Sequence, residues 1–446
     1  MPQSPDTIAA IATAPGVGGI GVVRVSGRNV AKVINALIGR HLKPRHASYS
    51  SFLDADGSII DRGIAIHFPG PDSYTGEDVL ELQGHGGSAV LQMLLRRCLE
   101  SGVRMAMPGE FTHRAYMNNK LDLVQAESIA DLINATNEQA ARCATRSLEG
   151  DFSKAINKVL IELIDLRMRI EAGLDFPEEE IDPNEKDYCE NKLNSILHQL
   201  EVVFKSAKQG SILREGAHIA LVGQPNVGKS SLLNRLSGEE IALVSEIAGT
   251  TRDSIRQEIN IQGVPLHIID TAGLRETQDV VEQLGMDRTR DVINKVDAVL
   301  ILMDVQQDCA IENQKIIELI PNSIPRLYVV NKIDLTNEKA RIESKDGDIY
   351  IYLSAKTEDG IELLRNKILT MINWHGESGV YMARERHLEA LVQANEFLHR
   401  AGNELLRPEL FAEELRMAQE SLGNITGEFT SDDLLGEIFS RFCIGK

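Results

Sequence analysis

The sequence predicts a multidomain protein with an α+β N-terminal domain, an all-α helical domain and an inserted α/β domain whose sheet is doubly wound and mostly parallel. Residues 1–118 alternate short apolar runs with Gly and Pro, which is typical of strands and loops. Residues 119–214 and 377–446 carry apolar side chains at helical spacing. Between them, in residues 215–376, apolar strands alternate with helical patterns. We therefore expect one helical domain that the α/β domain interrupts.

The amino-acid composition limits which kinds of protein and which binding partners are compatible with this sequence. The chain has 446 residues, with 47 Lys and Arg against 66 Asp and Glu, and a formal net charge of −19. Such a charge repels nucleic acids and anionic membranes, so any nucleic-acid partner must meet a local patch. The five cysteines are scattered, which favours a reducing cytosol over a disulfide framework. No apolar run approaches the ~18 residues of a membrane span, so we expect a cytoplasmic protein without a membrane partner.

Apolar patterns place the elements of the N-terminal and helical domains. Runs at residues 21–25, 63–69 and 79–82 predict strands. One helical stripe follows at Leu121, Val124, Ile129, Leu132 and Ile133. A second stripe lies near the C-terminus at Leu388, Leu391, Ala394, Phe397 and Leu398. The acidic stretch at residues 175–183 breaks the first helical segment and is expected to be a loop between helices.

A phosphate-binding motif opens the α/β domain. Residues 223–230 match G-x-x-x-x-G-K-[ST], directly after an apolar strand at residues 219–222 and before an apolar-striped helix. This context is what a P-loop requires. The glycines let backbone N–H groups close on phosphates, Lys229 neutralises the β and γ charges, and the Ser230 hydroxyl ligates Mg²⁺. The motif therefore predicts a P-loop nucleotide-binding domain.

Two later motifs select the base. Residues 331–334 (Asn-Lys-Ile-Asp) follow an apolar strand at 327–330. A carboxylate at Asp334 can accept from guanine N1–H and the exocyclic amine, whereas adenine presents an acceptor at N1. Residues 354–356 (Ser-Ala-Lys) follow another strand and are expected to turn a backbone N–H toward the guanine carbonyl. The nucleotide is therefore expected to be GTP.

The loops around the γ-phosphate hold the candidate catalytic groups. Residues 270–273 (Asp-Thr-Ala-Gly) follow a strand, as expected of a loop that senses the γ-phosphate. In the polar loop at 249–253, Thr251 is the candidate to complete the Mg²⁺ shell, with Thr250 as the alternative. Leu274 stands where Ras-like enzymes place a water-orienting Gln, so another residue must orient the water. Glu282 can do so directly or through a bridging water, although an exposed Glu at a helix start is the alternative interpretation.

These motifs resemble a known branch of GTPases. Pro225-Asn226 in the P-loop, the 249–253 loop and Leu274 are similar to the TrmE/Era/Der branch. The flanking sequences Thr-Gly-Glu-Asp at 75–78, Gln-Gly-His-Gly-Gly at 83–87, Pro-Gly-Glu-Phe at 108–111, Lys-Leu-Asp-Leu at 120–123 and Phe-Cys-Ile-Gly-Lys at 442–446 resemble the bacterial MnmE (TrmE) family of tRNA-modification GTPases. The resemblance runs through the whole chain.

The resemblance implies a reaction and partners. It implies a homodimer that, with the flavoprotein MnmG (GidA), installs aminomethyl or carboxymethylaminomethyl groups on carbon 5 of the tRNA wobble uridine. The one-carbon unit comes from a tetrahydrofolate, in its 5-formyl or methylene form, and FAD is expected on the partner. In this family the G domains approach each other across their nucleotides, and K⁺ supplies the charge that an arginine finger gives elsewhere. At a net charge of −19, we expect MnmG to hold much of the tRNA.

The resemblance also assigns residues. It implies that Glu282 is catalytic. The implied potassium positions are Asn226, Ser245, Ile247 and Thr250, beside the magnesium ligands Ser230 and Thr251. The implied folate positions are Arg24, Glu81 and Lys120, with Lys446 close to the same pocket. Cys443 is either a thiol near the modification site or an inert one. The expected nucleotide-binding residues are Asn226, Val227, Gly228, Lys229, Ser230, Ser231, Ser245, Thr250, Thr251, Asp270, Thr271, Ala272, Gly273, Asn331, Lys332, Asp334, Ser354, Ala355 and Lys356.

Two other classes of GTPase compete with this interpretation. A ribosome-assembly GTPase that binds rRNA, like Era or Der, would carry a basic RNA-binding module or a second G domain, and the sequence displays neither. A dynamin-like membrane remodeller is disfavoured by the acidic charge balance and by the lack of a basic amphipathic helix.

Overall fold

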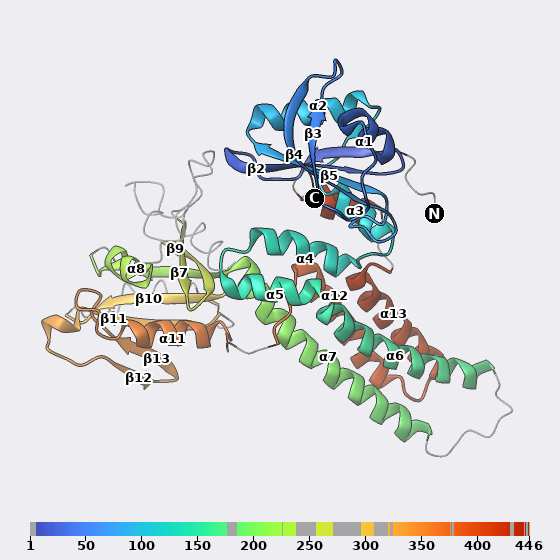
Figure 1. The fold of residues 1–446 in the computed structure, drawn as a ribbon. Coiled ribbons are helices and arrows are strands. Elements are labelled where there is room, and N and C mark those ends of the chain that lie inside the picture. Colours follow the sequence, from blue (N-terminus) through green and yellow to red (C-terminus); the bar gives the residue numbers. More distant parts are fainter. Residues whose placement is uncertain are drawn as a thin grey trace, which may run out of the picture. The chain divides into compact units, whose positions relative to one another are not determined.

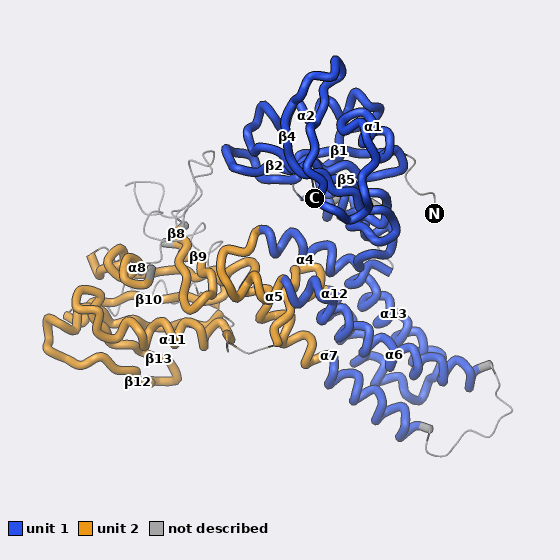
Figure 2. The backbone as a smooth tube through the Cα atoms, in the orientation of Figure 1, with its two compact units in different colours: residues 1–133, 145–200, 390–446 blue, residues 134–144, 201–389 orange. Residues whose placement is uncertain are grey.

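The structure is a computed structural model. It describes residues 6–175, 185–224, 226–237, 256–270, 296–306, 320–321, 324–374, 376, 379–428, 432–440, 442 and 445. The chain divides into two compact units (Figure 2). Unit 1 comprises residues 1–133, 145–200 and 390–446, and unit 2 comprises residues 134–144 and 201–389. The predicted domain boundaries after residues 118, 214 and 376 stay a prediction.

Unit 1 begins with a six-stranded sheet in the order β3-β4-β5-β2-β1-β6 (Figure 1). Its strands are β1 (Ile8–Ile11), β2 (Gly18–Ser26), β3 (Ser48–Leu53), β4 (Ile59–Phe68), β5 (Val79–Gly86) and β6 (Arg104–Met105). Neighbouring strands are antiparallel, except that β6 pairs parallel with β1. The three predicted strands are confirmed as parts of β2, β4 and β5, and β3 is the edge strand beside β4.

Period-two alternation decides which face of this sheet is buried. Val23 and Val25 of β2 and Leu80 and Leu82 of β5 are fully or almost fully buried, because helices cover their face of the sheet. These helices are α1 (Val30–Ile38) and α2 (Ser88–Glu100), while α3 (Glu110–Met117) follows β6. The alternate positions Arg24 and Glu81 therefore point to the opposite face.

The helical part of unit 1 packs around α6 (Asp151–Asp175) and α13 (Pro408–Thr426), which lie side by side (Figure 1). Unit 1 also contains α14 (Asp432–Ser440), nearly all of α4 (Leu123–Asn134) and the greater part of α12 (Glu385–Asn403). The division between the units falls after residue 200 within α7 (Glu185–Glu215), and α5 (Glu138–Leu148) belongs mostly to unit 2. In α12 the predicted stripe is confirmed at Leu391, Ala394 and Leu398, all fully buried. None of the described helices is both long and apolar enough to span a membrane.

The stripe predicted for α4 is wrong at its C-terminal end. Ile133 is 46% exposed, whereas Leu123 and Ala126 are fully buried. These two residues pack against Phe439 and Phe442 near the C-terminus of the chain. A partner more than 300 residues away in sequence (439 − 126 = 313) therefore sets which face of α4 is buried, and local periodicity does not reveal it.

Unit 2 contains a seven-stranded sheet in the order β12-β13-β11-β10-β7-β9-β8. Its strands are β7 (Ala217–Gly223), β8 (Arg256–Ile261), β9 (Val264–Asp270), β10 (Ala298–Asp304), β11 (Arg326–Asn331), β12 (Arg341–Lys345) and β13 (Asp348–Tyr352). The five inner strands are parallel, and only the edge strands β8 and β12 are antiparallel to their neighbours. Helices α8 (Lys229–Ser237) and α11 (Ile361–Met371) pack on it. The predicted doubly wound, mostly parallel α/β class is confirmed.

Candidate nucleotide-binding site

The P-loop connects β7 to α8 at the carboxyl edge of the parallel sheet, where ligands of such sheets bind. Asn226 and Gly228 have positive φ angles of 66° and 101°. A Cβ on Gly228 would lie 2.4 Å from Nδ2 of Asn331, so a side chain is excluded there. The predicted glycine requirement thus has a steric cause in this structure.

Lys229 begins α8 and is almost fully buried. Its Nζ donates to the carbonyl oxygens of Gly223 at 2.7 Å and Gln224 at 3.3 Å, which holds the ammonium over the loop. Ser230 and Ser231 follow in the first turn and are exposed. The amino end of a helix attracts anions because its first N–H groups have no partner within the helix. The positions of Lys229 and Ser230 therefore suit phosphate and a phosphate-bound cation.

Asn331, at the carboxyl end of β11, joins the P-loop to the 354–356 loop. Its side chain is 2% exposed, Nδ2 donates to the Val227 carbonyl at 2.9 Å, and Oδ1 accepts from the Ala355 N–H at 2.9 Å. One buried amide thus satisfies groups from two loops that are 128 residues apart (355 − 227). The structure brings these predicted residues together as a single unit.

Lys332 adds a second link to the P-loop. Its Nζ donates to the Asn226 carbonyl at 2.8 Å and to Oδ2 of Asp304 at 2.7 Å. Burial would raise the pKa of the Asp304 carboxyl, but hydrogen bonds from Lys332 and from the Gln306 N–H lower the pKa below its usual range. Asp304 is therefore ionised at neutral pH and fixes the lysine. Sequence reasoning missed Asp304; the signal was an acidic residue at the end of an apolar strand.

Asp334, the residue expected to read guanine, is oriented by Ser354. The buried Ser354 hydroxyl donates to Oδ1 of Asp334 at 2.6 Å and accepts from the Thr357 N–H at 3.2 Å. Ser354 therefore positions the carboxylate through its side chain, a role that the motif alone did not indicate. Ala355 is buried beside Asn331, whereas Lys356 is exposed.

The other predicted positions around the γ-phosphate lie outside the described residues. They are Ser245, Ile247, Thr250, Thr251, Thr271, Ala272, Gly273, Leu274 and Glu282. Asp270 ends β9, but its side chain is not described. In the described part of the chain, no group of three or more His, Cys, Asp or Glu residues is placed to hold a metal ion. The expected magnesium and potassium ligands stay predictions.

A second set of predicted residues meets on the sheet of unit 1. Arg24 of β2 lies opposite Glu81 of β5, and its Nε and Nη2 donate to Glu81 Oε1 at 3.1 and 2.9 Å. The guanidinium carbon lies 5.3 Å from the centre of the Tyr74 ring and 5.8 Å from that of Phe111. Sequence reasoning expected two separate ligand contacts, and the structure instead pairs Arg24 with Glu81 and adds two aromatic rings.

The remaining predicted folate positions, Lys120 and Lys446, belong to two other chain segments. Arg24 Nη1 donates to the Gly445 carbonyl at 3.5 Å, so the C-terminal segment approaches the pair. Lys446 and Cys443 themselves lie outside the described residues. Lys120 is exposed after α3, and a Cβ on Gly76 would lie 3.4 Å from its Cγ. No ion pair of Lys120 with Glu81 is seen in the described part of the chain.

Two family models match the chain. The model described as "MnmE helical domain" matches residues 123–443, and the model described as "GTP-binding protein TrmE N-terminus" matches residues 7–120. Together they extend over nearly the entire sequence.

Curated relatives match end to end. A protein of Chromobacterium violaceum is 54% identical over 448 residues, covering 100% of both chains. Proteins of Nitrosomonas europaea (55% identical, 99% of this chain and 100% of that one) and Nitrosospira multiformis (56%, 99% of each) are similar. All three are named tRNA modification GTPase MnmE. Among solved structures, the G domain of Thermotoga maritima FeoB is 23% identical and covers 35% of this chain and 98% of its own, and its TM-score of 0.27 adds nothing to the assignment.

The Asn331 bridge yields a prediction about nucleotide affinity. Asn331→Asp keeps an acceptor for the Ala355 N–H but turns a carboxylate oxygen toward the Val227 carbonyl. Because a buried unsatisfied group costs about 1–3 kcal/mol, we expect GDP to bind at least ~10-fold more weakly. Titration with a fluorescent GDP analogue measures this.

Asn337→Asp is the matched control, because Asn337 is exposed and the change in charge is the same. This control should bind GDP like the wild type. Unchanged affinity in Asn331→Asp, with an intact fold by circular dichroism, would show that the bridge does not support the nucleotide site.

Proposed function

The chain belongs to the MnmE (TrmE) family of tRNA modification GTPases, and from this premise we propose that it acts with the flavoprotein MnmG (GidA) on carbon 5 of the tRNA wobble uridine. The product is an aminomethyl or carboxymethylaminomethyl uridine. The one-carbon unit comes from a tetrahydrofolate in its 5-formyl or methylene form. FAD belongs to the partner, and the complex is cytoplasmic.

One observation carries the GTPase part of the proposal. The P-loop and the two base-recognition loops arrive from three parallel strands, and Asn331 and Lys332 tie them into one unit. At one end Lys229 and the start of α8 present positive charge for phosphates. At the other, the half-buried carboxylate of Asp334 is held by Ser354 for the guanine edge. This separation of charge along one site fits GTP.

The residues also fit Mg²⁺. This cation binds few protein ligands and keeps waters and phosphate oxygens, so the lack of a carboxylate cluster among the described residues suits it. Ser230 and Thr251 would hold it, and it would neutralise charge on the β and γ phosphates. Ser230 is exposed at the first turn of α8, where such a cation would sit. Residues 270–273 would complete the phosphate end.

In our proposal, GTP hydrolysis depends on Glu282 and on a bound K⁺ ion. Leu274 has no group that can orient water, so Glu282 aligns the attacking water directly or through a second water. K⁺ held by Asn226, Ser245, Ile247 and Thr250 supplies the charge of an arginine finger when two G domains of a homodimer face each other.

The folate proposal rests on the pair of Arg24 and Glu81. The carboxylate of Glu81 matches the amino-oxo-pyrimidine edge of a pterin, and the rings of Tyr74 and Phe111 flank the guanidinium of Arg24. The Gly445 carbonyl at Arg24 brings the C-terminal segment to this place, which supports roles for Lys446 and Cys443 there. Lys120 supplies further positive charge for an anionic tail. These contacts support one folate site on the sheet of unit 1.

The wobble nucleosides of tRNA test the function as a whole. Mass spectrometry of tRNA from cells lacking this protein should show wobble uridines without the modification. Wild-type protein should restore it, Lys229→Ala should not, and Lys208→Ala, which removes an exposed lysine of α7, should restore it like the wild type. Modified uridine in the deletion strain would refute the proposal, and accumulation of immature ribosomal subunits there would favour a ribosome-assembly GTPase.

Potassium dependence tests the cation. We expect GTP hydrolysis to be at least ~10-fold faster in K⁺ than in Na⁺ at equal ionic strength. Ligands spaced for K⁺ do not hold the smaller Na⁺ well, and a cation missing from the transition state costs at least that much. Asn226→Gly should remove the difference, since glycine tolerates the φ of 66° and deletes only the amide. Equal rates of the wild type in the two salts would contradict the assignment.

Calorimetry with 5-formyltetrahydrofolate tests the folate site. Glu81→Gln should weaken binding by about tenfold or more, because a charge-assisted hydrogen bond contributes about 1.5–3 kcal/mol. Glu100→Gln in α2 is the matched control, at a half-exposed position, and should bind like the wild type. Equal affinity of Glu81→Gln and wild type argues against a folate at this pair.

A further inference from the structure

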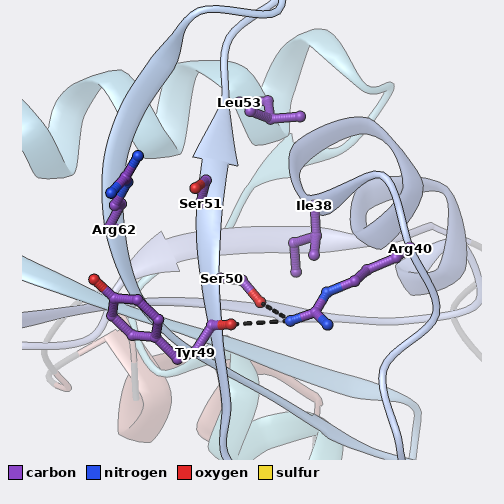
Figure 3. Close-up of a pocket in the computed structure, with 7 residues that line it drawn as sticks. All are labelled: Ile38, Arg40, Tyr49, Ser50, Ser51, Leu53 and Arg62. Carbon is purple, nitrogen blue, oxygen red and sulfur yellow. Dashed lines mark hydrogen bonds between the residues drawn. The ribbon is translucent and has the colours of Figure 1, made fainter.

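A polar cavity of about 350 Å³ lies at the edge strand β3 of unit 1 (Figure 3). Arg40, Tyr49, Ser51 and Arg62 contribute its polar groups, together with Ser50. Arg40 follows α1, while Tyr49, Ser50 and Ser51 belong to β3 and Arg62 belongs to β4. None of the functional assignments above uses these residues.

The guanidinium groups of Arg40 and Arg62 lie on opposite sides of β3. Ser51 lies opposite Arg62 in the β3–β4 pairing, and Tyr49 is on the same face as Ser51. Figure 3 shows Tyr49 and Arg62 on one side of β3 and Arg40 on the other. Arg40 Nη2 donates to the Tyr49 carbonyl at 2.9 Å and to Ser50 Oγ at 3.1 Å, so this guanidinium is held in place.

Arg62 and the Tyr49 ring are available to a ligand. The Arg62 guanidinium is exposed and makes no hydrogen bond or ion pair with the residues that the structure describes. Tyr49 is 70% exposed although its ring is large and apolar. An exposed aromatic ring beside arginines is the combination that proteins use to stack an unpaired base and hold its phosphate.

The charge around the cavity differs from that of the whole chain. No Asp or Glu occurs from residue 7 to residue 53, a stretch that contains Arg24, Arg28, Lys32, Arg40, Lys43 and Arg45. Residues 40–46 include two further histidines, and all the basic residues of this segment are exposed. In a chain of net charge −19, residues 7–53 are therefore a basic stretch of sequence, and its residues 40–49 lie next to the cavity in the chain.

The nearest carboxylates in sequence do not neutralise this stretch. Asp54 and Asp56 accept from backbone N–H groups of the β3–β4 turn, at 2.8 and 2.9 Å. Asp61 accepts from the N–H groups of Arg62 and His85, and from His85 Nδ1. Burial would raise the pKa of Asp61, but these bonds lower it, so its charge is committed to them.

We propose that Arg62, on the side of this cavity that carries Tyr49, binds a phosphate of tRNA, with the adjacent unpaired base stacked on Tyr49. The proposal rests on the proposed function, because it takes tRNA as the nucleic acid. It places part of the tRNA contact on this chain, whereas the net charge alone assigned most of it to the partner protein. The cavity is distinct from the Arg24–Glu81 pair, which lies on β2 and β5 with β4 between it and β3.

The test measures binding of an unmodified tRNA transcript by fluorescence anisotropy over a range of salt concentrations. Arg62→Glu should weaken binding at least tenfold and reduce the slope of log affinity against log salt by about one, as expected for one lost phosphate contact. Arg62→Lys should keep most of the affinity. Tyr49→Phe should bind like the wild type, whereas Tyr49→Ala should bind several-fold more weakly because stacking is lost.

Arg96→Glu in α2 is the matched control, because Arg96 is 62% exposed, lies outside the cavity and undergoes the same change of charge. It should change affinity less than twofold. Basal GTP hydrolysis by Arg62→Glu should equal that of the wild type, because the nucleotide site lies in unit 2. An unchanged circular dichroism spectrum and melting temperature verify the fold of unit 1.

Two results would overturn the proposal. One is equal binding by Arg62→Glu and Arg96→Glu, and the other is no binding by the wild type. Competition by millimolar inorganic phosphate as strong as that by an equal concentration of unlabelled tRNA would assign the cavity to a small phosphate ligand instead. The wobble-nucleoside experiment is independent of this one. If the deletion strain lacks the modification but Arg62→Glu binds tRNA like Arg96→Glu, the proposed function stands and only this binding site is refuted.

Discussion

The buried amide of Asn331 is the interaction on which the nucleotide site depends. Its two hydrogen bonds hold the Val227 carbonyl and the Ala355 N–H, which belong to loops that follow different strands. Because the amide is 2% exposed, water cannot replace either bond. The bridge also explains Gly228, since the same amide occupies the space of a Cβ there. A glycine usually explained by ligand approach is thus required already by packing within the protein.

The parallel sheet makes this bridge possible. β7, β11 and β13 end at the same edge, so three loops that are distant in sequence arrive within hydrogen-bond reach. β10 lies between β7 and β11, and its last residue, Asp304, anchors Lys332. The charge of that buried carboxylate is compensated by the lysine, whose remaining bond reaches Asn226. The strand order therefore determines which polar residues can cooperate.

The sequence predicted the fold class and the P-loop because those depend on local pattern: an apolar strand, a glycine-rich turn and a striped helix. It also predicted that residues 331–334 and 354–356 meet. It did not predict that Ser354 acts on Asp334, or that Asp304 holds Lys332, because these contacts depend on side-chain directions at the ends of neighbouring strands. The predicted burial of α4 was wrong at its C-terminal end for a similar reason, since Phe439 and Phe442 determine which face of the helix is buried.

The two sites of unit 1 show how an acidic protein can receive anionic ligands. The charge of Arg24 is neutralised by Glu81. The pair therefore offers a ligand hydrogen-bonding groups beside two aromatic rings, with little net charge. Arg62 has no such partner among the described residues, because the neighbouring carboxylate of Asp61 is bound to backbone N–H groups and to His85. Since exposed charges are screened within ~8–10 Å, the local balance of charge governs capture at short range, and the total of −19 governs only distant repulsion. A paired arginine therefore suits recognition of a flat heterocycle, and an unpaired arginine suits a phosphate.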